Sequence, residues 1–308
     1  MVPVSTVHAG PNPKYFGKGR GITYYNLMSD QFTGTNAIVV PGTLHDALSL
    51  LTIVLEQPTE LNPTEIITDT GAYTDLIFGL FWSLGYQFSP RLADVGGARL
   101  WRIEPSADYG SLNSLCRDRI NLDLIRQNWD DMLRLAGSLK MGLVHPGSVI
   151  RNLQASDRQT PLARAISECG RISKTLHILS ILDDETKRRG LLIQLNRHEG
   201  RNKLARTVFH ARKGEVRQHY RQGQEDQLGA LGLVVNIIIL WNTIYMDAAI
   251  AELESEGHVI DPADKARLSP LGSEHINMLG RYSFAIPESV ARGELRPLRD
   301  PFASLDEL

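Results

Sequence analysis

The run Glu65-Ile-Ile-Thr-Asp-Thr-Gly71 decides the fold class, because a series of β-branched residues ends at an acid and a glycine. Ile66, Ile67 and Thr68 favour an extended strand, and Asp-Thr-Gly is typical of a turn. We therefore expect the Asp69 carboxylate at the tip of a buried strand. The simplest alternative is that Asp69 only helps to form the turn.

The sequence around this strand predicts a mixed sheet of about five strands covered by helices. Residues 1–41 contain three β-rich runs separated by Gly and Pro, which is typical of an antiparallel meander. A helix that follows such a meander implies a crossover to a parallel neighbour. The expected strands are 2–7, 22–27, 36–40, 65–69 and 86–92, and the expected helices are 44–56, with Thr43 as its cap, and 73–84, which ends at Gly85.

From about residue 105 the pattern becomes helical, and no convincing strand follows. The sequence therefore predicts four regions: a sheet region over 1–104, a helical insertion over 105–190, a pair of core helices over 191–250 and a C-terminal extension over 251–308. The expected helices of the block after residue 105 are 111–118, 120–140, 146–154, 161–181 and 184–195.

Residues 228–246 form the most apolar stretch and are long enough to span a bilayer. Two glycines and two asparagines interrupt the stretch, and no second such segment exists, so we interpret it as a buried core helix and expect no membrane association. The N-terminus has no signal-peptide pattern. Two cysteines, Cys116 and Cys169, are too few for a disulfide framework and are expected to be buried, which favours a cytoplasmic location.

The net charge of −2 hides local basic regions. Residues 197–221 hold eight Lys or Arg against two acids, and local charge decides what a surface attracts. Among residues 1–29, Lys14, Lys18 and Arg20 have no acidic neighbour, which is consistent with contacts to a nucleic-acid backbone. The patterns of a phosphate-binding P-loop, a zinc site and a nucleophile elbow are absent from the sequence.

A second acid, Glu199, lies within the basic region at helical spacing. Lys203 and Arg206 share its stripe of the helix, and Arg197 and Arg201 flank that stripe. One interpretation is a surface helix stabilised by i,i+4 ion pairs. The other is that the cations bind phosphates while the acid, which would repel DNA, holds a metal ion. Asp69 and Glu199 together suit metal-assisted phosphoryl transfer on a polyanion, although such sites usually have a third carboxylate.

Several longer motifs stand out along the chain. They include Gly10-Pro-Asn-Pro-Lys-Tyr-Phe-Gly17, Thr68-Asp-Thr-Gly71, Leu80-Phe-Trp-Ser-Leu-Gly-Tyr-Gln-Phe-Ser-Pro-Arg91, Leu195-Asn-Arg-His-Glu-Gly-Arg201, Leu240-Trp-Asn-Thr243 and Leu268-Ser-Pro-Leu-Gly-Ser-Glu-His-Ile-Asn277. From residue 1 to about 285, these motifs resemble the catalytic region of Tn3-family transposases. The resemblance implies an RNase H-like core of the DDE type, a mixed sheet with helices that is interrupted by an all-helical insertion and followed by C-terminal helices. Ser273 departs from the family, which commonly has an aromatic residue there.

By this resemblance Asp69 is the second catalytic Asp and Glu199 the catalytic Glu, and both are ligands of Mg²⁺. The implied reaction is cleavage of DNA at transposon ends and strand transfer, with DNA and further transposase subunits as partners. The first catalytic Asp is expected ahead of Met1, so the 308-residue chain is expected to show no cleavage. The alternative function is that of an inactive remnant that only binds DNA or transposase subunits. Asp30, Asp75 and Glu65 are the nearest substitutes, and none lies on the first strand.

Overall fold

The structure is a computed structural model in which two compact units are distinguished. The first unit comprises Met1–Glu199 with Val216–Gly229, and the second comprises Gly200–Glu215 with Ala230–Leu308. The described residues are 2–3, 9–11, 13, 17–41, 46–70, 73–92, 96–97, 99–116, 118–154, 159–209, 223–277 and 288–293.

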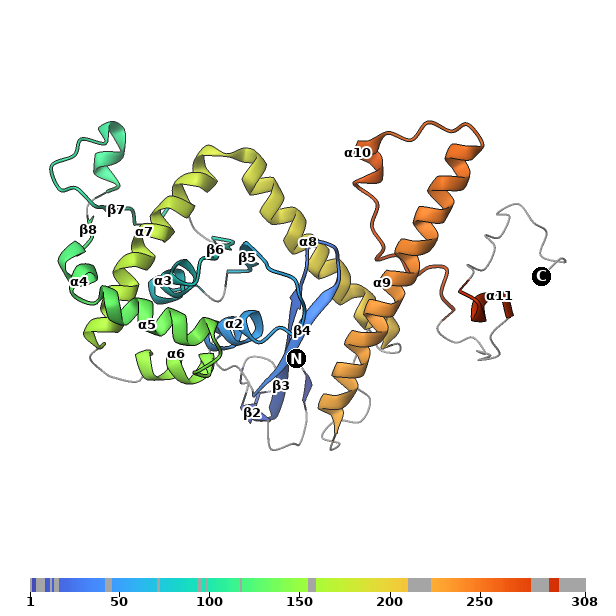
Figure 1. The fold of residues 1–308 in the computed structure, drawn as a ribbon, viewed down its shortest axis with the longest axis horizontal. Helices are drawn as coiled ribbons and strands as arrows, with labels where there is room; N and C mark the ends of the chain where they lie inside the picture. Colours follow the sequence, from blue (N-terminus) through green and yellow to red (C-terminus); the bar gives the residue numbers. More distant parts are fainter. Residues whose placement is uncertain are drawn as a thin grey trace. The chain divides into compact units, whose positions relative to one another are not determined.

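An antiparallel sheet forms the N-terminal part of the first unit. Strands β3 (Arg20–Met28) and β4 (Gly34–Pro41) form a long hairpin, which Figure 1 shows in blue. The short strands β1 (Val2–Pro3) and β2 (Gly10–Pro11) both pair antiparallel with β3. The antiparallel pairing expected from the sequence is therefore confirmed over the described residues. The expected cap Thr43 lies outside them.

The strand that ends at Asp69 is β5 (Glu65–Thr68), and it pairs in parallel with β6 (Gln87–Pro90). Helix α3 (Asp75–Ser83) connects these two parallel strands. The crossover expected from the sequence, through the helix 44–56 to a parallel neighbour of the meander, is not found among the described residues, because β4 and β5 belong to separate sheets. The described strands therefore do not form one sheet of five strands. The described part of β1 pairs only with β3, which leaves the two larger sheets unconnected.

Helices dominate the rest of the first unit, largely as the sequence predicts. Three details differ. The expected helix 111–118 is a 3₁₀ helix over Gly110–Ser114, the expected helix 120–140 is divided at Asn128, and Asp118 pairs with Trp101 in a small parallel sheet. Helix α8 also continues without a break through the Glu199 segment. The elements are α2 (Asp46–Leu55), β7 (Trp101–Arg102), the 3₁₀ helix η1 (Gly110–Ser114), β8 (Asp118–Arg119), α4 (Leu122–Gln127), α5 (Trp129–Lys140), α6 (Pro146–Gln154), α7 (Pro161–Asp183) and α8 (Glu185–Val208).

Helices α3 and α7 cross with their backbones in contact, and two glycines permit the crossing. A Cβ atom on Gly170 of α7 would lie 1.7 Å from the carbonyl oxygen of Asp75, and one on Gly79 of α3 would lie 2.0 Å from that of Ile166. No side chain fits at either position. The crossing lies in the main core, where Phe78 and Phe81 of α3 are fully buried and both contact Phe88 of β6.

His177 joins α7 to the end of β6. Its Nε2 lies 3.0 Å from the carbonyl oxygen of Pro90, and since a carbonyl only accepts, the proton is on Nε2. The side chain is buried beside Phe78. Burial lowers the pKa of His177, although the hydrogen bond to Pro90 partly opposes this effect. The two cysteines, Cys116 and Cys169, are free and buried, as expected.

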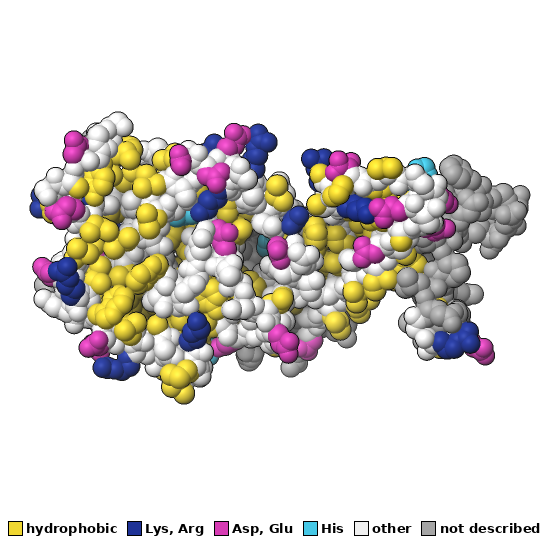
Figure 2. Space-filling view, turned by 45° about the horizontal axis from the view of Figure 1, so that its top comes forward, with side chains coloured by type: hydrophobic (Ala, Val, Ile, Leu, Met, Phe, Trp, Pro, Cys, Tyr) yellow, Lys and Arg dark blue, Asp and Glu magenta, His cyan; other side chains and the backbone are white. Residues whose placement is uncertain are grey.

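The second unit contains α9 (Gln224–Ser255), together with α10 (Pro262–Lys265) and α11 (Glu288–Ala291). The sequence predicts that 228–246 is a buried core helix. This prediction is wrong for most of the stretch, because only 22% of its apolar window is buried. Val235 and Ile239 face the interior, whereas Leu233, Ile237 and Leu240 are exposed. Hydrophobic side chains of this kind are visible on the surface in Figure 2.

Much of α9 is exposed because the helix is apolar on all sides, whereas the described residues of its unit cover only one of these sides. By length and composition, α9 is the one helix in the described part of the chain that could cross a bilayer. This is weak support for a membrane assignment, because core helices meet the same criterion.

Replacement of Gly170 by alanine tests the crossing. We expect Gly170→Ala to lower the free energy of unfolding by about 1–3 kcal/mol, because the added methyl group must displace the backbone of α3. Gly190→Ala in α8 is the matched control, since its Cβ atom would meet nothing within 4 Å. The control should gain roughly 0.5–1 kcal/mol from helix propensity. Urea denaturation measures both, and equal effects would contradict the close crossing.

The buried His177 predicts a dependence of stability on pH. Its folded pKa lies below the unfolded value of about 6.5, so below this pH the unfolded chain takes up a proton that the folded chain excludes. Stability should therefore fall on acidification, by at most about 1.4 kcal/mol per pH unit for this group. His177→Gln keeps a donor for Pro90 and should lose less stability between pH 7.5 and 5.5. Urea midpoints that change identically with pH in both proteins would disprove this role.

Candidate active site

Asp69 lies at the carboxyl edge of the parallel pair β5–β6. Arg91 occupies the equivalent position after β6, and its backbone N–H donates to the carbonyl oxygen of Thr68 at 2.8 Å. The Nη1 atom of Arg91 is 4.0 Å from Oδ1 of Asp69, whose side chain is 73% exposed. An exposed ion pair of this length contributes little free energy. The Asp69 carboxylate is therefore accessible to a ligand from solvent.

Glu199 lies on α8, and its side chain is exposed. Arg197, two residues earlier, anchors this part of the helix to the turn between β3 and β4. Its Nη1 donates to the carbonyl oxygen of Asp30 at 3.0 Å, and its guanidinium stacks 4.8 Å from the ring centre of Phe32. Phe32 adopts a left-handed backbone conformation, with φ of 66°. The hairpin and the helix that carries Glu199 are thereby held together.

The two acids match the donor chemistry of Mg²⁺, which prefers oxygen ligands and is commonly held by one or two carboxylates together with water and substrate phosphates. Both belong to the first unit, and both are exposed. Among the described residues, no three His, Cys, Asp or Glu side chains form a group that could hold a metal ion. Asp69 and Glu199 thus match the ligand chemistry of such an ion in kind, and no described contact brings the two carboxylates together.

Two of the three acids considered as substitutes are already engaged. Asp75 forms ion pairs with Arg171 and Lys174. Glu65 accepts hydrogen bonds from Gln87 and Ser89 at the opposite end of β5 from Asp69. The backbone oxygen of Asp30 accepts the bond from Arg197, and no described contact brings its carboxylate to Asp69.

The cations expected to contact DNA are not all equally available. Arg197 is half-buried and already engaged with Asp30 and Phe32. Lys18 and Arg20 are exposed before and at the start of β3, and Lys203 and Arg206 are exposed on α8. Lys14 lies outside the described residues.

Arg201 is different, because its side chain is buried and the residue is 3% exposed. Its Nη2 donates to the side chain of Asn236 at 2.6 Å and to the carbonyl oxygen of Gly232 at 3.4 Å. In this arrangement Arg201 ties α8 to α9 within the second unit, and it is not available to a phosphate. The expectation of a DNA contact is therefore not retained for Arg201, since spacing on a helix does not tell which side a neighbour covers.

The second unit brings two of the quoted motifs together. The side chain of Asn242 donates to the carbonyl oxygens of Pro270, at 2.7 Å, and Gly272, at 2.9 Å. The ring of Trp241 stacks on that of His275 with centres 5.2 Å apart. Beside them, hydrogen bonds from the backbone N–H groups of Ser273 and of Glu274 itself lower the pKa of Glu274.

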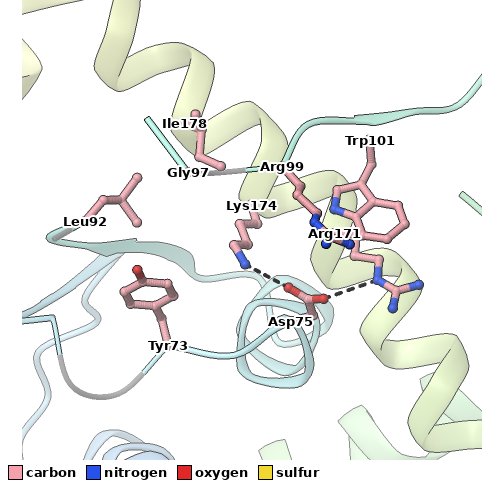
Figure 3. A pocket seen from close by; sticks show the side chains of 9 residues that line it. All are labelled: Tyr73, Asp75, Leu92, Gly97, Arg99, Trp101, Arg171, Lys174 and Ile178. Atoms are coloured by element: carbon pink, nitrogen blue, oxygen red, sulfur yellow. Dashed lines mark hydrogen bonds and ion pairs between the residues drawn. The ribbon is translucent and has the colours of Figure 1, made fainter. Parts of the chain in front are cut away.

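A cavity of about 490 Å³ is lined by residues that follow β5 and β6 in the chain and by residues of α7, and apart from Asp75 none of them was considered as a site residue from the sequence. It opens between the start of α3, helix α7 and the segment after β6, and Figure 3 shows the side chains that line it. The sequence signal that could have revealed these residues is the pair Arg171 and Lys174, which lie three positions apart on a helix. The pattern of a helical insertion does not tell, however, that this pair packs against the start of α3. The polar and aromatic lining residues are Tyr73, Asp75, Arg99, Trp101, Arg171 and Lys174.

Comparison with known proteins identifies the class. Residues 1–282 match the family model described as Tn3 transposase DDE domain. The chain is 54% identical to the transposase for transposon gamma-delta of Escherichia coli K12 over 97% of its length, and 46% identical to the transposase for transposon Tn4556 of Streptomyces fradiae over 99%. It is 38% identical to the transposase for transposon Tn1546 of Enterococcus faecium over 96%.

These matches place the chain among the DNA transposases. It belongs to the Tn3 transposase DDE domain family, as its motifs indicated. The chain spans about a third of the length of these relatives, with 30%, 34% and 30% of each covered.

Proposed function

We propose that this chain is the catalytic region of a Tn3-family transposase that cleaves DNA at transposon ends and joins the freed ends to target DNA. The observation that carries the proposal is the family match over residues 1–282, together with an accessible acid at each of the two matching motif positions, Asp69 and Glu199. Self-association with further transposase subunits remains a prediction from the family.

The proposed role of Asp69 and Glu199 is to hold divalent metal ions. When bound, such ions lower the pKa of the attacking water and stabilise the leaving oxygen during in-line displacement at a phosphodiester. Asp69 is suited to this role because it lies at the end of a strand, and its ion pair with Arg91 among the described residues is long and exposed. Glu199 is suited because Arg197, anchored at Asp30 and Phe32, fixes the helix turn that presents it.

The exposed cations Lys18, Arg20, Lys203 and Arg206 are proposed to contact the phosphates of the DNA backbone. Such contacts supply affinity that depends weakly on sequence and strongly on salt. They would also offset the repulsion between DNA and the two acids.

The experiment measures metal-dependent cleavage of a transposon-end duplex by a polypeptide that contains these 308 residues. Asp69→Asn and Glu199→Gln keep the side-chain shape and remove the charge. We expect each to lower the rate by about 100-fold or more, because catalysis here depends on positioned charge. Removal of divalent ions with EDTA should abolish cleavage.

Asp123→Asn is the control, because Asp123 is an exposed acid on α4 that pairs with Arg126. It should leave the rate unchanged. A second measurement on the 308-residue chain, Mn²⁺ binding followed by electron paramagnetic resonance, gives a result even without cleavage. Undiminished Mn²⁺ binding and cleavage in Asp69→Asn would refute its role as a ligand.

A further inference from the structure

The cavity lined by Tyr73, Asp75 and residues of α7 is the feature that the proposed catalytic role does not explain. Its volume of about 490 Å³ lies within the range of small-ligand sites. Three cations from two elements line it: Arg99 from the segment before β7, and Arg171 and Lys174 from α7. One carboxylate, that of Asp75, is among the lining residues. In Figure 3 this carboxylate lies between the charged ends of Lys174 and Arg171.

The cavity shares an edge of the sheet with Asp69. Tyr73 lies four residues after Asp69, so their Cα atoms are at most about 14 Å apart. Leu92, which also lines the cavity, directly follows Arg91, and Arg91 forms a long ion pair with Asp69. Because β5 and β6 are parallel, both connections leave the sheet at its carboxyl edge, where ligands of open parallel sheets commonly bind.

The cations keep donors for a ligand. Lys174 uses one donor on Asp75 Oδ1 at 3.1 Å, and Arg171 uses Nε on Asp75 Oδ2 at 3.2 Å and Nη1 on Glu168. A lysine has three N–H donors and an arginine five, so both retain further donors. The carboxylates of Asp75 and Glu168 thus orient these two cations, and further N–H donors remain available for a ligand.

Arg99 adds a cation outside this network. Its Nη1 is 3.8 Å from Asp118 Oδ2, and its side chain is 77% exposed, so the pair is weak. Trp101 stacks on the guanidinium of Arg171 at 4.2 Å, which fixes the direction of that group. The cavity lining thus carries three cations and one carboxylate, while Asp118 and Glu168 pair with two of the cations from outside the lining.

A purely structural ion network would explain Asp75, Arg171 and Lys174, because these residues join α3 to α7 at the glycine crossing. It does not explain Arg99, which has no described contact with α3 or α7, or a cavity large enough for a phosphate group with its sugar. A site for a phosphate ester explains both features, since arginine and lysine are the preferred protein partners of phosphate.

We propose that this cavity binds a phosphate group of the DNA strand whose reacting phosphodiester lies at Asp69. The proposal rests on the proposed function and extends it by naming a backbone contact near the acid. The phosphate of a free nucleotide has the same chemistry, so the experiment includes a nucleotide as competitor.

The test compares Arg99→Gln with the wild-type chain by fluorescence anisotropy on labelled single-stranded and duplex oligonucleotides, in EDTA and at several NaCl concentrations. Loss of one phosphate contact should weaken binding several-fold and reduce the slope of log K against log salt by about one. Arg134→Gln is the matched control, because Arg134 is an exposed arginine of α5 paired with Asp131 at 2.7 Å. It should change neither quantity.

Competition by thymidine monophosphate separates the two phosphate sources. If millimolar nucleotide fails to displace the oligonucleotide while Arg99→Gln still weakens its binding, the result supports a DNA strand as the ligand of the cavity. Displacement in the wild type that is lost in Arg99→Gln supports the same phosphate site with a free nucleotide as its ligand.

Equal affinity and equal salt slope in Arg99→Gln and Arg134→Gln overturn the cavity proposal and leave the proposed function intact, since DNA still binds. Absence of DNA binding by the wild-type chain at low salt overturns both. The binding assay contains EDTA, so its outcome does not depend on whether the chain shows metal-dependent cleavage of DNA. Thermal unfolding of each variant checks that Arg99→Gln remains folded, as expected for an exposed side chain.

Discussion

The contact on which the rest of the first unit depends is the backbone crossing of α3 and α7. Gly79 and Gly170 allow the two helices to approach more closely than any side chain would permit. This approach sets Asp75, at the start of α3, against Arg171 and Lys174 of α7. It also sets α7 against the end of β6 through His177. A crossing that serves packing thereby also brings together the charged residues that line one cavity.

Two kinds of anchoring hold the candidate catalytic acids. Asp69 is carried by a short strand whose parallel partner lies over a core of phenylalanine rings. Glu199 is carried by a helix that Arg197 attaches to the β3–β4 turn. Neither carboxylate is itself part of a strong ion pair among the described contacts. Rigid supports with accessible acids are what a metal-dependent site on a large polyanionic substrate requires.

Much of the fold could be predicted because its signals are local. The β-branched run before Asp69, the alternation of Gly and Pro before β3, and the apolar spacing of α3 each reflect the conformational preference of neighbouring residues. Two features of the helical region were not predicted: the break at Asn128, whose hydrogen bonds are local, and the strand at Asp118, which depends on a distant partner. Asn128 divides a helix that periodicity predicts as one, and Asp118 finds a strand partner in Trp101, on the other side of the 3₁₀ helix. Helix α9 was predicted to be buried because hydropathy does not tell how much of an apolar surface is covered.

By itself the sequence determined the family, the two candidate acids and the order of helices and strands, because motifs and periodicity are properties of consecutive residues. Only the tertiary structure decided which cations are available. Arg201 and Arg206 lie five positions apart on one helix, yet the first is buried against Asn236 and the second is exposed. Arg99 and Lys174 are far apart in the chain, yet they line one cavity. The reason is physical: burial and convergence of charge arise from helix packing, which residues distant in the chain determine together.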